Sequence, residues 1–577
     1  MAAPCRMASS PPSPSSSTAE SSDPAHDTVS NASSNYGGID PEVEENLYIL
    51  PYVSDEGLRS DATDRRKIIG SSQHDYYPLP LTFEAAVSAE MPSLPPTTSG
   101  CRLLSLPSEL IDAILAYLPP CDLAIASASC RSLHAHATSD VHWYQRVQAN
   151  VPGTKLETPY PCRTYRELYA AHDPRWFLPK YKIWFCDRDL MGKMIIVRYD
   201  QRRGCIEGYQ LLAISNRTTY QHWPADNSVI IHAFEPRVKL HLDKPVLQFH
   251  ARNREDDANS SGILGNQFVP EVPMVIDDRS DAMFSNFLMA RPLDFTTATS
   301  RMEAPFPYGN VWPPPSIPAR HRVAGAASGL DGDDLSPADL PTRRSEASDQ
   351  AFRIRQWMEM AGAPTAGLFL GPGHAGLIQA IHANINIGVM GGRGVPGVHI
   401  GEEVVTYSTL DPVVYTPTPL KPWRGIWVGD YSGHGCEFLL INQPDDEEVS
   451  DEELGLVRGA EESEDGWAQR RTDARVHRGR LEAIKLTGDP NVPRGEYTFV
   501  ADDLGEAGFV GLAQEPPFQG TRVVRSKGHV AGTGFLDDKY IESQLMLISH
   551  DRLAQYWVGF GHISFFERVN IDEFMTP

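Results

Sequence analysis

The sequence predicts an α+β protein in which a small helical module precedes an antiparallel, β-barrel-like domain with long disordered inserts. A stretch with helical periodicity covers residues 104–146. From Trp176 onward, short β-rich runs follow one another about every ten residues with turn residues between them. The 577 residues also include 47 prolines and 45 glycines, and the mean hydropathy is −0.33. This composition indicates much irregular chain around a folded part.

Charge and cysteine usage exclude several classes of function. The formal net charge of −24 disfavours general nucleic-acid binding and binding to anionic membranes, because both need clustered Lys and Arg. The eight cysteines include no C-x-x-C pair, and no histidine spacing matches a metal motif. We therefore expect no disulfide framework, no metal and no cofactor. Because no apolar run is long enough to span a membrane, we also expect a soluble protein of the cytoplasm, the nucleus or both.

The first 98 residues are rich in Ser, Pro and Asp and show little periodicity. Such a segment cannot bury enough apolar surface to offset the entropy lost on ordering. We expect residues 1–98 to be disordered.

The helical module is predicted over residues 102–148. Its first helix carries apolar residues at offsets 0, 1, 4, 5 and 8, which place them on one stripe of a helix: Leu110, Ile111, Ile114, Leu115 and Leu118. Pro119 and Pro120 end this helix, and two further short helices follow. A unit of this size buries too little surface to be stable by itself, so its remaining apolar stripe requires a partner or a neighbouring domain.

The module resembles an F-box at twelve positions. The matching residues are Leu106, Pro107, Glu109, Leu110, Ile114, Leu115, Leu118, Pro119, Asp122, Leu123, Cys130 and Arg131. The resemblance implies that all of them except Asp122 and Arg131 bind the adaptor Skp1, and through it a cullin-RING ubiquitin ligase. The alternative is an ordinary buried helical hairpin.

The rest of the chain is predicted to form one barrel interrupted by two inserts. Many short strands are most economically accommodated in a closed barrel, because closure removes exposed edges. The predicted order is a first part of the barrel (176–250), a largely disordered insertion (251–345), a helix over 346–360 with further barrel strands (346–442), an acidic loop (443–478) and final strands (479–577). The acidic loop is expected to be solvated, and Ser450 and Ser463 are candidate phosphorylation sites within it.

Two turns between predicted strands are dense in glycine, proline, charged and aromatic residues. They cover residues 424–437 and 485–494, and we expect them to form one mouth of the barrel that binds a substrate. The candidate substrate-binding residues are Arg424, Trp427, Tyr431, His434, Glu437, Lys485, Asp489 and Arg494. In the alternative interpretation, the aromatic residues belong to the core.

These two turns carry a second resemblance. Residues 424–431, 434–437 and 487–495 are similar to the carboxy-terminal domain of the F-box-only protein thirty-one family, also called a cyclin D binding domain. The resemblance implies a β-barrel that captures a substrate segment, commonly one near a chain end. Together the two resemblances imply a non-catalytic substrate receptor of a Skp1–cullin–F-box ligase that promotes ubiquitination of a bound protein. The alternative is a barrel enzyme or small-molecule-binding protein that carries an F-box.

Overall fold

The structure is a computed structural model that describes residues 101–215, 219–251, 268–276, 283–303, 311–325, 337–360, 399–431 and 435–577. The region predicted to be disordered, residues 1–98, lies outside these described residues. In the parts of the chain that are described, no helix is long and apolar enough to cross a membrane.

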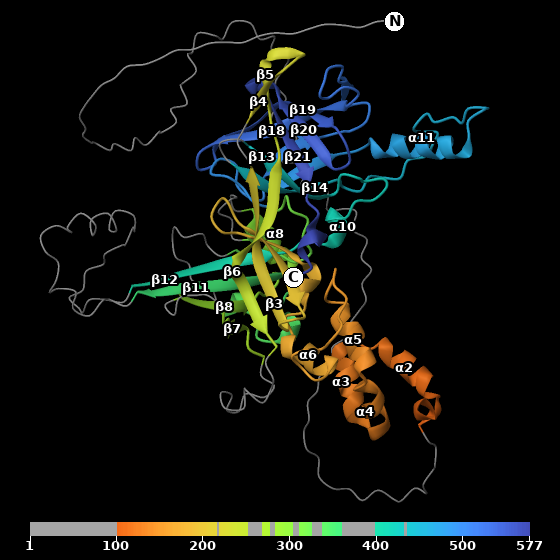
Figure 1. The fold of residues 1–577 in the computed structure, drawn as a ribbon, viewed down its shortest axis with the longest axis vertical. Helices are drawn as coiled ribbons and strands as arrows, with labels where there is room; N and C mark the ends of the chain where they lie inside the picture. The colour runs from red at the N-terminus through yellow and green to blue at the C-terminus, as the bar shows by residue number, and fades with distance from the viewer. Residues whose placement is uncertain are drawn as a thin grey trace, which may run out of the picture. The chain divides into compact units, whose positions relative to one another are not determined.

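The predicted helical module consists of consecutive short helices (Figure 1). They are η2 (Arg102–Ser105), α2 (Ser108–Ala116), α3 (Pro120–Ser129), α4 (Arg131–Ala137) and α5 (Asp140–Gln148). A small core joins them, and it contains Ile111, Leu115, Leu123, Ala137 and Trp143.

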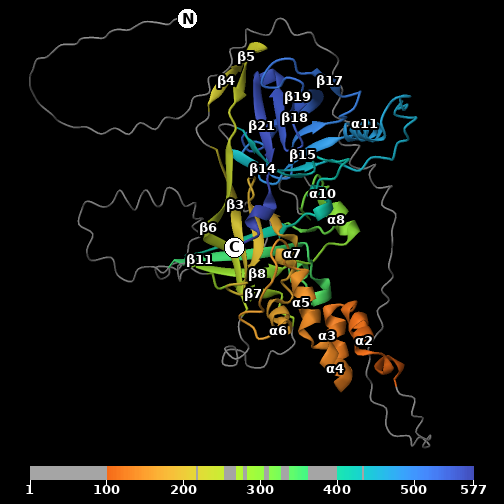
Figure 2. The same cartoon turned by 45° about the vertical axis from the view of Figure 1, so that its right-hand side comes forward.

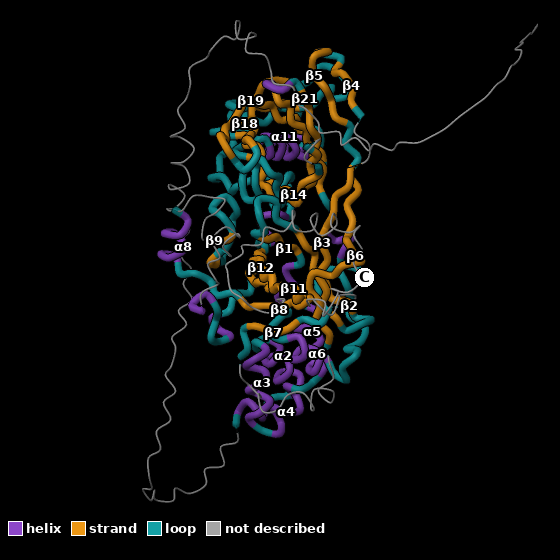
Figure 3. The backbone as a smooth tube through the Cα atoms, turned by 90° about the vertical axis from the view of Figure 1, so that its left-hand side faces the viewer, coloured by secondary structure: helices purple, strands orange, loops and turns teal. Residues whose placement is uncertain are grey.

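Two further helices, α6 (Tyr165–His172) and α7 (Phe177–Tyr181), connect this module to the sheets. The Tyr165 amide donates to Asp140 Oδ1 at 2.8 Å, and the rings of Trp143 and Tyr169 lie 5.4 Å apart. The tube representation shows helices α2 to α6 gathered into one group (Figure 3). Helix α6 therefore packs directly against α5 of the helical module.

An open sheet of eight strands follows, and all of its pairings are antiparallel. Its strand order is β6-β3-β2-β1-β12-β11-β8-β7. The bounds are β1 (Ile183–Cys186), β2 (Met194–Asp200), β3 (Cys205–Ser215), β6 (Pro236–His250), β7 (Glu271–Pro273), β8 (Met283–Met289), β11 (Ala351–Met360) and β12 (His399–Ser408).

The second sheet closes into a barrel, because β13 pairs with both β14 and β21. The ring consists of β13 (Gly425–Asp430), β14 (Cys436–Asn442), β15 (Leu481–Lys485), β16 (Tyr497–Ala501), β18 (Arg522–Gly532), β19 (Leu536–Leu547), β20 (Arg552–Trp557) and β21 (His562–Arg568). Outside the ring, β17 (Phe509–Leu512) pairs with β18. The hairpin of β4 (Tyr220–Trp223) and β5 (Asp226–His232) lies beside β21, with β5 parallel to it (Figure 2).

Alternate residues of the barrel strands point inward. The inner cluster draws on every strand of the ring and includes Trp427, Leu439, Ala483, Phe499, Val524, Leu545, Leu553 and Phe566. Residues of the opposite parity, such as Val428 and Phe438, pack outside the barrel in a cluster that also contains Phe185 of the open sheet and Ile231 of β5. The barrel and the open sheet therefore share a core.

The prediction of one barrel from residue 176 onward is wrong in its architecture. Residues 176–250 supply strands β1 to β3 and β6 of the open sheet, and only β4 and β5 join the sheet of the barrel. Periodicity predicts that a segment is a strand, but not which strand it pairs with.

The predicted helix over residues 346–360 is also wrong. After η5 (Arg344–Glu346), residues Ala351–Met360 form β11, which pairs with β12 along its whole length and with β8. Phe352 and Ile354, two residues apart, are both buried in the core of the sheet. The sequence pattern of this segment is compatible with a helix or a strand. Pairing with the two neighbouring strands β8 and β12 favours the strand.

Both inserts contain ordered structure. The insertion over 251–345 contributes β7 and β8, together with α8 (Phe295–Met302), β9 (Val311–Trp312) and β10 (Val323–Ala324). The acidic segment contains α11 (Glu464–Val476), and Arg475 Nη2 lies 2.6 Å from Asp451 Oδ1. Ser463 caps α11 by accepting from the Gly466 amide at 3.1 Å, and Ser450 exchanges hydrogen bonds with Glu453. Arginines on α11 thus pair with Asp451 and Glu462 and offset a small part of the acidic charge.

Candidate functional site

One face of α2 exposes large apolar side chains. On α2, the exposed fraction is 51% for Leu110 and 43% for Ile114, whereas Ile111 and Leu115 are buried. Tyr117 and Ile125 are exposed as well, at 89% and 67%. Soluble proteins seldom expose several large apolar residues on neighbouring short helices unless the surface binds a partner.

The ten residues predicted to bind Skp1 divide between this surface and the core beneath it. Pro107, Glu109, Leu110, Ile114 and Pro119 are exposed. Leu106, Leu118 and Cys130 are half-buried, and Leu115 and Leu123 belong to the core. Tyr117 and Ile125 were missed by the sequence analysis, although the helical period of 3.6 residues places Tyr117, which directly follows α2, next to Ile114.

The second candidate site lies inside the barrel at one of its ends, where polar side chains replace the apolar side chains of the interior. Antiparallel pairing aligns Gly429 with Glu437 and Leu439 with Lys485, so the end of β13, the start of β14 and the end of β15 coincide. Pairing of Ser543 with Trp557 and of Gln555 with Ser564 brings β19, β20 and β21 to the same end. We call this the polar end and define it by the residues Tyr431, Glu437, Lys485, Asp489, Ser543, Gln555, Trp557 and Ser564.

Lys485 is the centre of the polar end. Its Nζ lies 2.8 Å from Glu437 Oε2 and 2.6 Å from Asp489 Oδ2. The same ammonium lies 4.8 Å from the centroid of the Tyr431 ring, and the Tyr431 hydroxyl is 2.8 Å from Thr498 Oγ1. Two carboxyl groups and one aromatic face thus surround a single buried cation.

The pKa values of the two carboxyl groups shift in opposite directions. Burial raises the pKa of Glu437 to about 8. Lys485 offsets part of this rise, and the nearby charge of Asp489 adds to it. Burial would also raise the pKa of Asp489, but Lys485 and the hydrogen bond from Glu437 outweigh it and lower this pKa to about 2. Near neutral pH, the cluster therefore holds an ion pair of Lys485 and Asp489 beside a mostly protonated, uncharged Glu437.

Neighbouring residues complete a hydrogen-bonding layer. Ser526 Oγ and Ser543 Oγ lie 2.7 Å apart, and Gln555 Nε2 donates to Ser543 Oγ at 3.1 Å. Among the described residues, Gln555 Oε1 and Trp557 Nε1 are buried without a hydrogen-bond partner. Buried polar atoms are usually paired, so this acceptor and this donor are exceptions that a bound water or ligand would explain.

The structure does not bring all the predicted substrate-binding residues together. Tyr431, Glu437, Lys485 and Asp489 lie at the polar end. Arg424 precedes β13 and therefore lies at the opposite end of this strand, where it donates to the Gln443 carbonyl and pairs with Asp445. Trp427 is fully buried among the apolar residues of the barrel interior, and His434 lies outside the described residues.

Arg494 contacts the open sheet. Its guanidinium donates to the Asp187 carbonyl and lies 4.8 Å from the ring centroid of Trp312. The amides of Gly488 and Arg494 also donate to the carbonyls of Met191 and Leu190, each at 2.8 Å. The turn over 485–494 therefore has two faces: Lys485 and Asp489 point into the barrel, while Arg494 joins the turn to the loop between β1 and β2.

Near neutral pH the polar end carries no net charge, because Lys485 pairs with Asp489 and Glu437 is mostly protonated. Among the described residues, no group of three or more His, Cys, Asp or Glu side chains could hold a metal ion.

Comparison with known proteins supports both resemblances. A family model of F-box-like domains matches residues 103–149, which cover α2 to α5. A model of the Cyclin D1 binding domain matches residues 407–573, which cover the whole barrel. A curated relative, Protein EXECUTER 2, chloroplastic, of Arabidopsis thaliana, is 24% identical over 228 residues. That match covers 39% of this chain and 32% of the relative's length.

Proposed function

We propose that this protein, whose chain combines an F-box-like domain with a Cyclin D1 binding domain, is a substrate adaptor of a Skp1–cullin–F-box ubiquitin ligase. In this proposal the helical module binds Skp1 and the barrel holds a segment of a substrate protein. The adaptor performs no covalent chemistry. It holds a substrate lysine near a charged ubiquitin carrier, which replaces a bimolecular encounter by a local one.

The observation that carries the proposal is the exposed apolar face of the module. Leu110 and Ile114 are exposed on α2, whereas the residues that directly follow them, Ile111 and Leu115, lie in the module's own core. Full burial of one such side chain contributes about 1.5–3 kcal/mol. Leu110, Ile114, Tyr117 and Ile125 together therefore supply enough apolar surface for a stable complex with Skp1.

The polar end supports a role in substrate capture. A substrate segment that places an uncharged polar group there would pair the buried Gln555 Oε1 and Trp557 Nε1 and would meet the protonated Glu437. A buried site of this kind discriminates strongly, because a group that cannot form these hydrogen bonds leaves the site's own atoms unpaired. We place this activity in the cytoplasm, the nucleus or both.

A second candidate function is binding of a small molecule in the barrel, with or without catalysis. The same unpartnered atoms of Gln555 and Trp557 favour it. Mass spectrometry of the purified protein under native conditions distinguishes the two functions. A stoichiometric small molecule that is lost in Gln555→Leu supports this candidate.

The adaptor proposal is tested by copurification and substrate profiling. The full chain is coexpressed with Skp1, and ubiquitinated proteins are compared between cells that carry the wild type and cells that carry Leu110→Asp with Ile114→Asp. We expect the double variant to lose Skp1 and to leave a defined set of proteins unmodified. Retention of Skp1 by a folded double variant would show that the assignment is wrong.

A further inference from the structure

A short segment after the last barrel strand holds three parts of the molecule together. Residues 571–576, which we call the clasp, leave the barrel after β21 and begin with η9 (Ile571–Phe574). Ile571 and Met575 are buried in the core that the barrel and the open sheet share. Asp572 Oδ1 also lies 2.6 Å from the Nζ of Lys182, which directly precedes β1.

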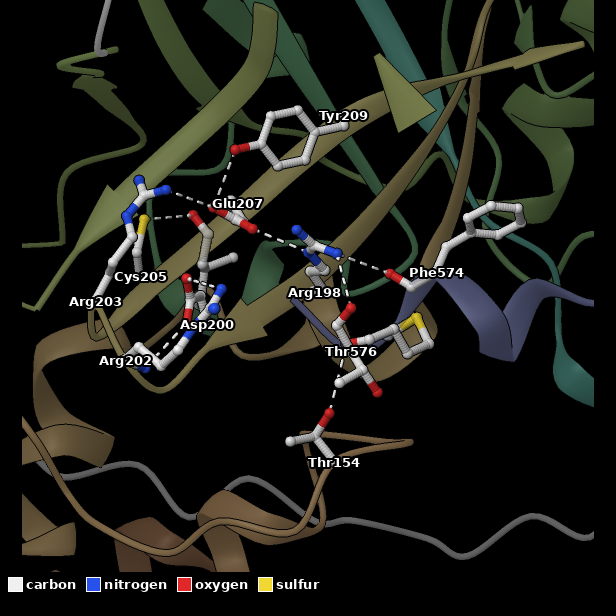
Figure 4. A network of polar contacts seen from close by, with 12 residues as sticks. Thr154, Arg198, Asp200, Arg202, Arg203, Cys205, Glu207, Tyr209, Phe574 and Thr576 are labelled. Atoms are coloured by element: carbon white, nitrogen blue, oxygen red, sulfur yellow. Dashed lines mark hydrogen bonds and ion pairs between the residues drawn. The ribbon is translucent and has the colours of Figure 1, made fainter. Parts of the chain in front are cut away.

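Arg198 on β2 is the main polar contact of the clasp (Figure 4). Its Nη1 donates to the carbonyl oxygens of Phe574 and Thr576, each at 3.2 Å. Its Nε donates to Glu207 Oε1 at 2.9 Å, and the arginine and the glutamate are both buried. The guanidinium, whose orientation is fixed by Glu207, therefore donates hydrogen bonds to two carbonyl groups of the clasp. A planar fork of this kind gives geometric specificity that a lysine lacks.

The clasp also contacts the loop that follows the helical module. Met575 packs against Gly153, and a Cβ at this glycine would lie 2.9 Å from the Met575 Cβ. Gly153 has a φ of +76°, a conformation that favours glycine. Thr154 Oγ1 adds a weak hydrogen bond to the Met575 carbonyl at 3.5 Å. Residues 150–156 continue directly from α5, so this contact reaches the module that carries the exposed apolar face.

We propose that Arg198 is a positioning residue for ubiquitin transfer: through the clasp, it fixes the barrel relative to the helical module, and thereby decides which substrate lysines reach the ubiquitin carrier. This inference rests on the proposed adaptor function. Proximity catalysis depends on geometry, because a small displacement of a bound reactant lowers the rate steeply. The substrate is held by the barrel and the ligase by the module, so the clasp, together with the core that the barrel and the open sheet share, fixes the distance between them.

Other contacts join the barrel to the open sheet, including those of Arg494 with the loop between β1 and β2. Residues 147–156 in turn pack on the open sheet, because Val147, Val151 and Leu156 lie in its core and Gln201 is hydrogen-bonded to Lys155 and Glu157. The clasp ties the end of the barrel domain to this packed segment, so its loss should loosen the barrel relative to the module.

The test uses the full chain bound to Skp1. Arg198→Met removes the donors to the clasp, and Glu207 keeps Arg203 and Tyr209 as partners. Gly153→Ala disturbs the opposite side of the clasp without touching Arg198. Arg202→Met is the matched control, because Arg202 lies in the same network but pairs with Asp200.

Two readouts are measured for each variant. Labels introduced without cysteine chemistry at the exposed positions Arg131 and Lys527 report the distance between the module and the barrel. Mass spectrometry maps the ubiquitinated lysines on one fixed substrate.

For Arg198→Met and Gly153→Ala, we expect a broader distance distribution and a wider set of modified lysines, while the affinities for Skp1 and substrate stay within about twofold of wild type. Arg198→Lys should restore the pattern in part, and Arg202→Met should match wild type. An unchanged distance distribution in both clasp variants would overturn the inference. So would a broader distribution with an unchanged lysine pattern. Failure of the wild type to bind Skp1 would instead refute the adaptor function, and the distance measurement on the chain alone would still report on the clasp.

Discussion

Lys485 and Glu437 face each other inside the barrel, with Nζ 2.8 Å from Oε2, and both residues are only 2% exposed. Asp489 neutralises the lysine, so Glu437 is left to carry a proton. Removing one member of such a buried group usually costs more than the group itself contributes, because a charge remains without a partner. The most informative substitutions here are therefore those that preserve shape.

Glu437→Gln should flatten the dependence of stability on pH. In the folded protein the pKa of Glu437 is raised from 4.5 to about 8. Between these values the folded state keeps a proton that the unfolded chain releases, so stability falls as pH rises through this window, by up to about 1.4 kcal/mol per pH unit. Urea unfolding at several pH values measures this decline. The variant lacks the titrating group, and a decline as steep as that of wild type would contradict the assignment.

Leu110→Ala with Ile114→Ala should weaken Skp1 binding by about 3 kcal/mol or more while leaving the thermal midpoint unchanged, because both side chains are exposed. Leu115→Ala provides the contrast. This residue is 4% exposed in the core, so its truncation should destabilise the module by about 2–5 kcal/mol. Calorimetric titration with Skp1 and differential scanning calorimetry separate the two effects. The same loss of stability in both variants would argue for a buried hairpin instead of a docking surface.

Trp427→Ala should destabilise the barrel by about 3–5 kcal/mol, because the side chain is fully buried in the apolar interior. Tyr431→Phe removes only the hydrogen bond to Thr498 and should cost about 1 kcal/mol. Chemical denaturation measures both values. Near-wild-type stability of Trp427→Ala combined with loss of substrate would restore the interpretation of Trp427 as a binding anchor.

Arg494→Ala should loosen the contact between the barrel and the open sheet. The variant loses the hydrogen bond to the Asp187 carbonyl and the contact with the Trp312 ring. We expect faster hydrogen exchange in residues 187–193 and 486–495 and a lower thermal midpoint. Arg525, which is exposed on β18, offers the matched control Arg525→Ala. Loss of substrate binding without any change in exchange would instead support the predicted role of Arg494 in binding.

Ser463→Ala should destabilise α11 locally by about 1 kcal/mol, because the hydroxyl caps the helix through the Gly466 amide. Ser463→Asp preserves the cap and should behave as wild type. Hydrogen exchange of residues 464–476 reports the difference. Equal protection in both variants would show that the arginine pairs alone hold the helix.

Much of the helical module could be predicted from the sequence, because its signals are local. The spacing of Leu110, Ile111, Ile114 and Leu115 defines a helical face, and Pro119 with Pro120 ends the helix. In the barrel, the two dense turns pointed to Tyr431, Glu437, Lys485 and Asp489 as members of one site. Gln555 and Trp557 carry no such signal, since an isolated Gln or Trp in a strand suits either a core or a surface.

The sequence by itself therefore determined which segments form the helices of the module and most of the strands, because periodicity and turn residues act within about ten neighbouring residues. Only the tertiary structure decided how the strands are shared between the open sheet and the barrel, and that residues 351–360 form a strand. It also decided that Arg424 and Tyr431, seven positions apart, lie at opposite ends of β13. These outcomes depend on pairings such as that of Trp427 with Arg568, which join residues far apart in the chain. The free energy of such pairings comes from packing between strands, and no local pattern encodes it.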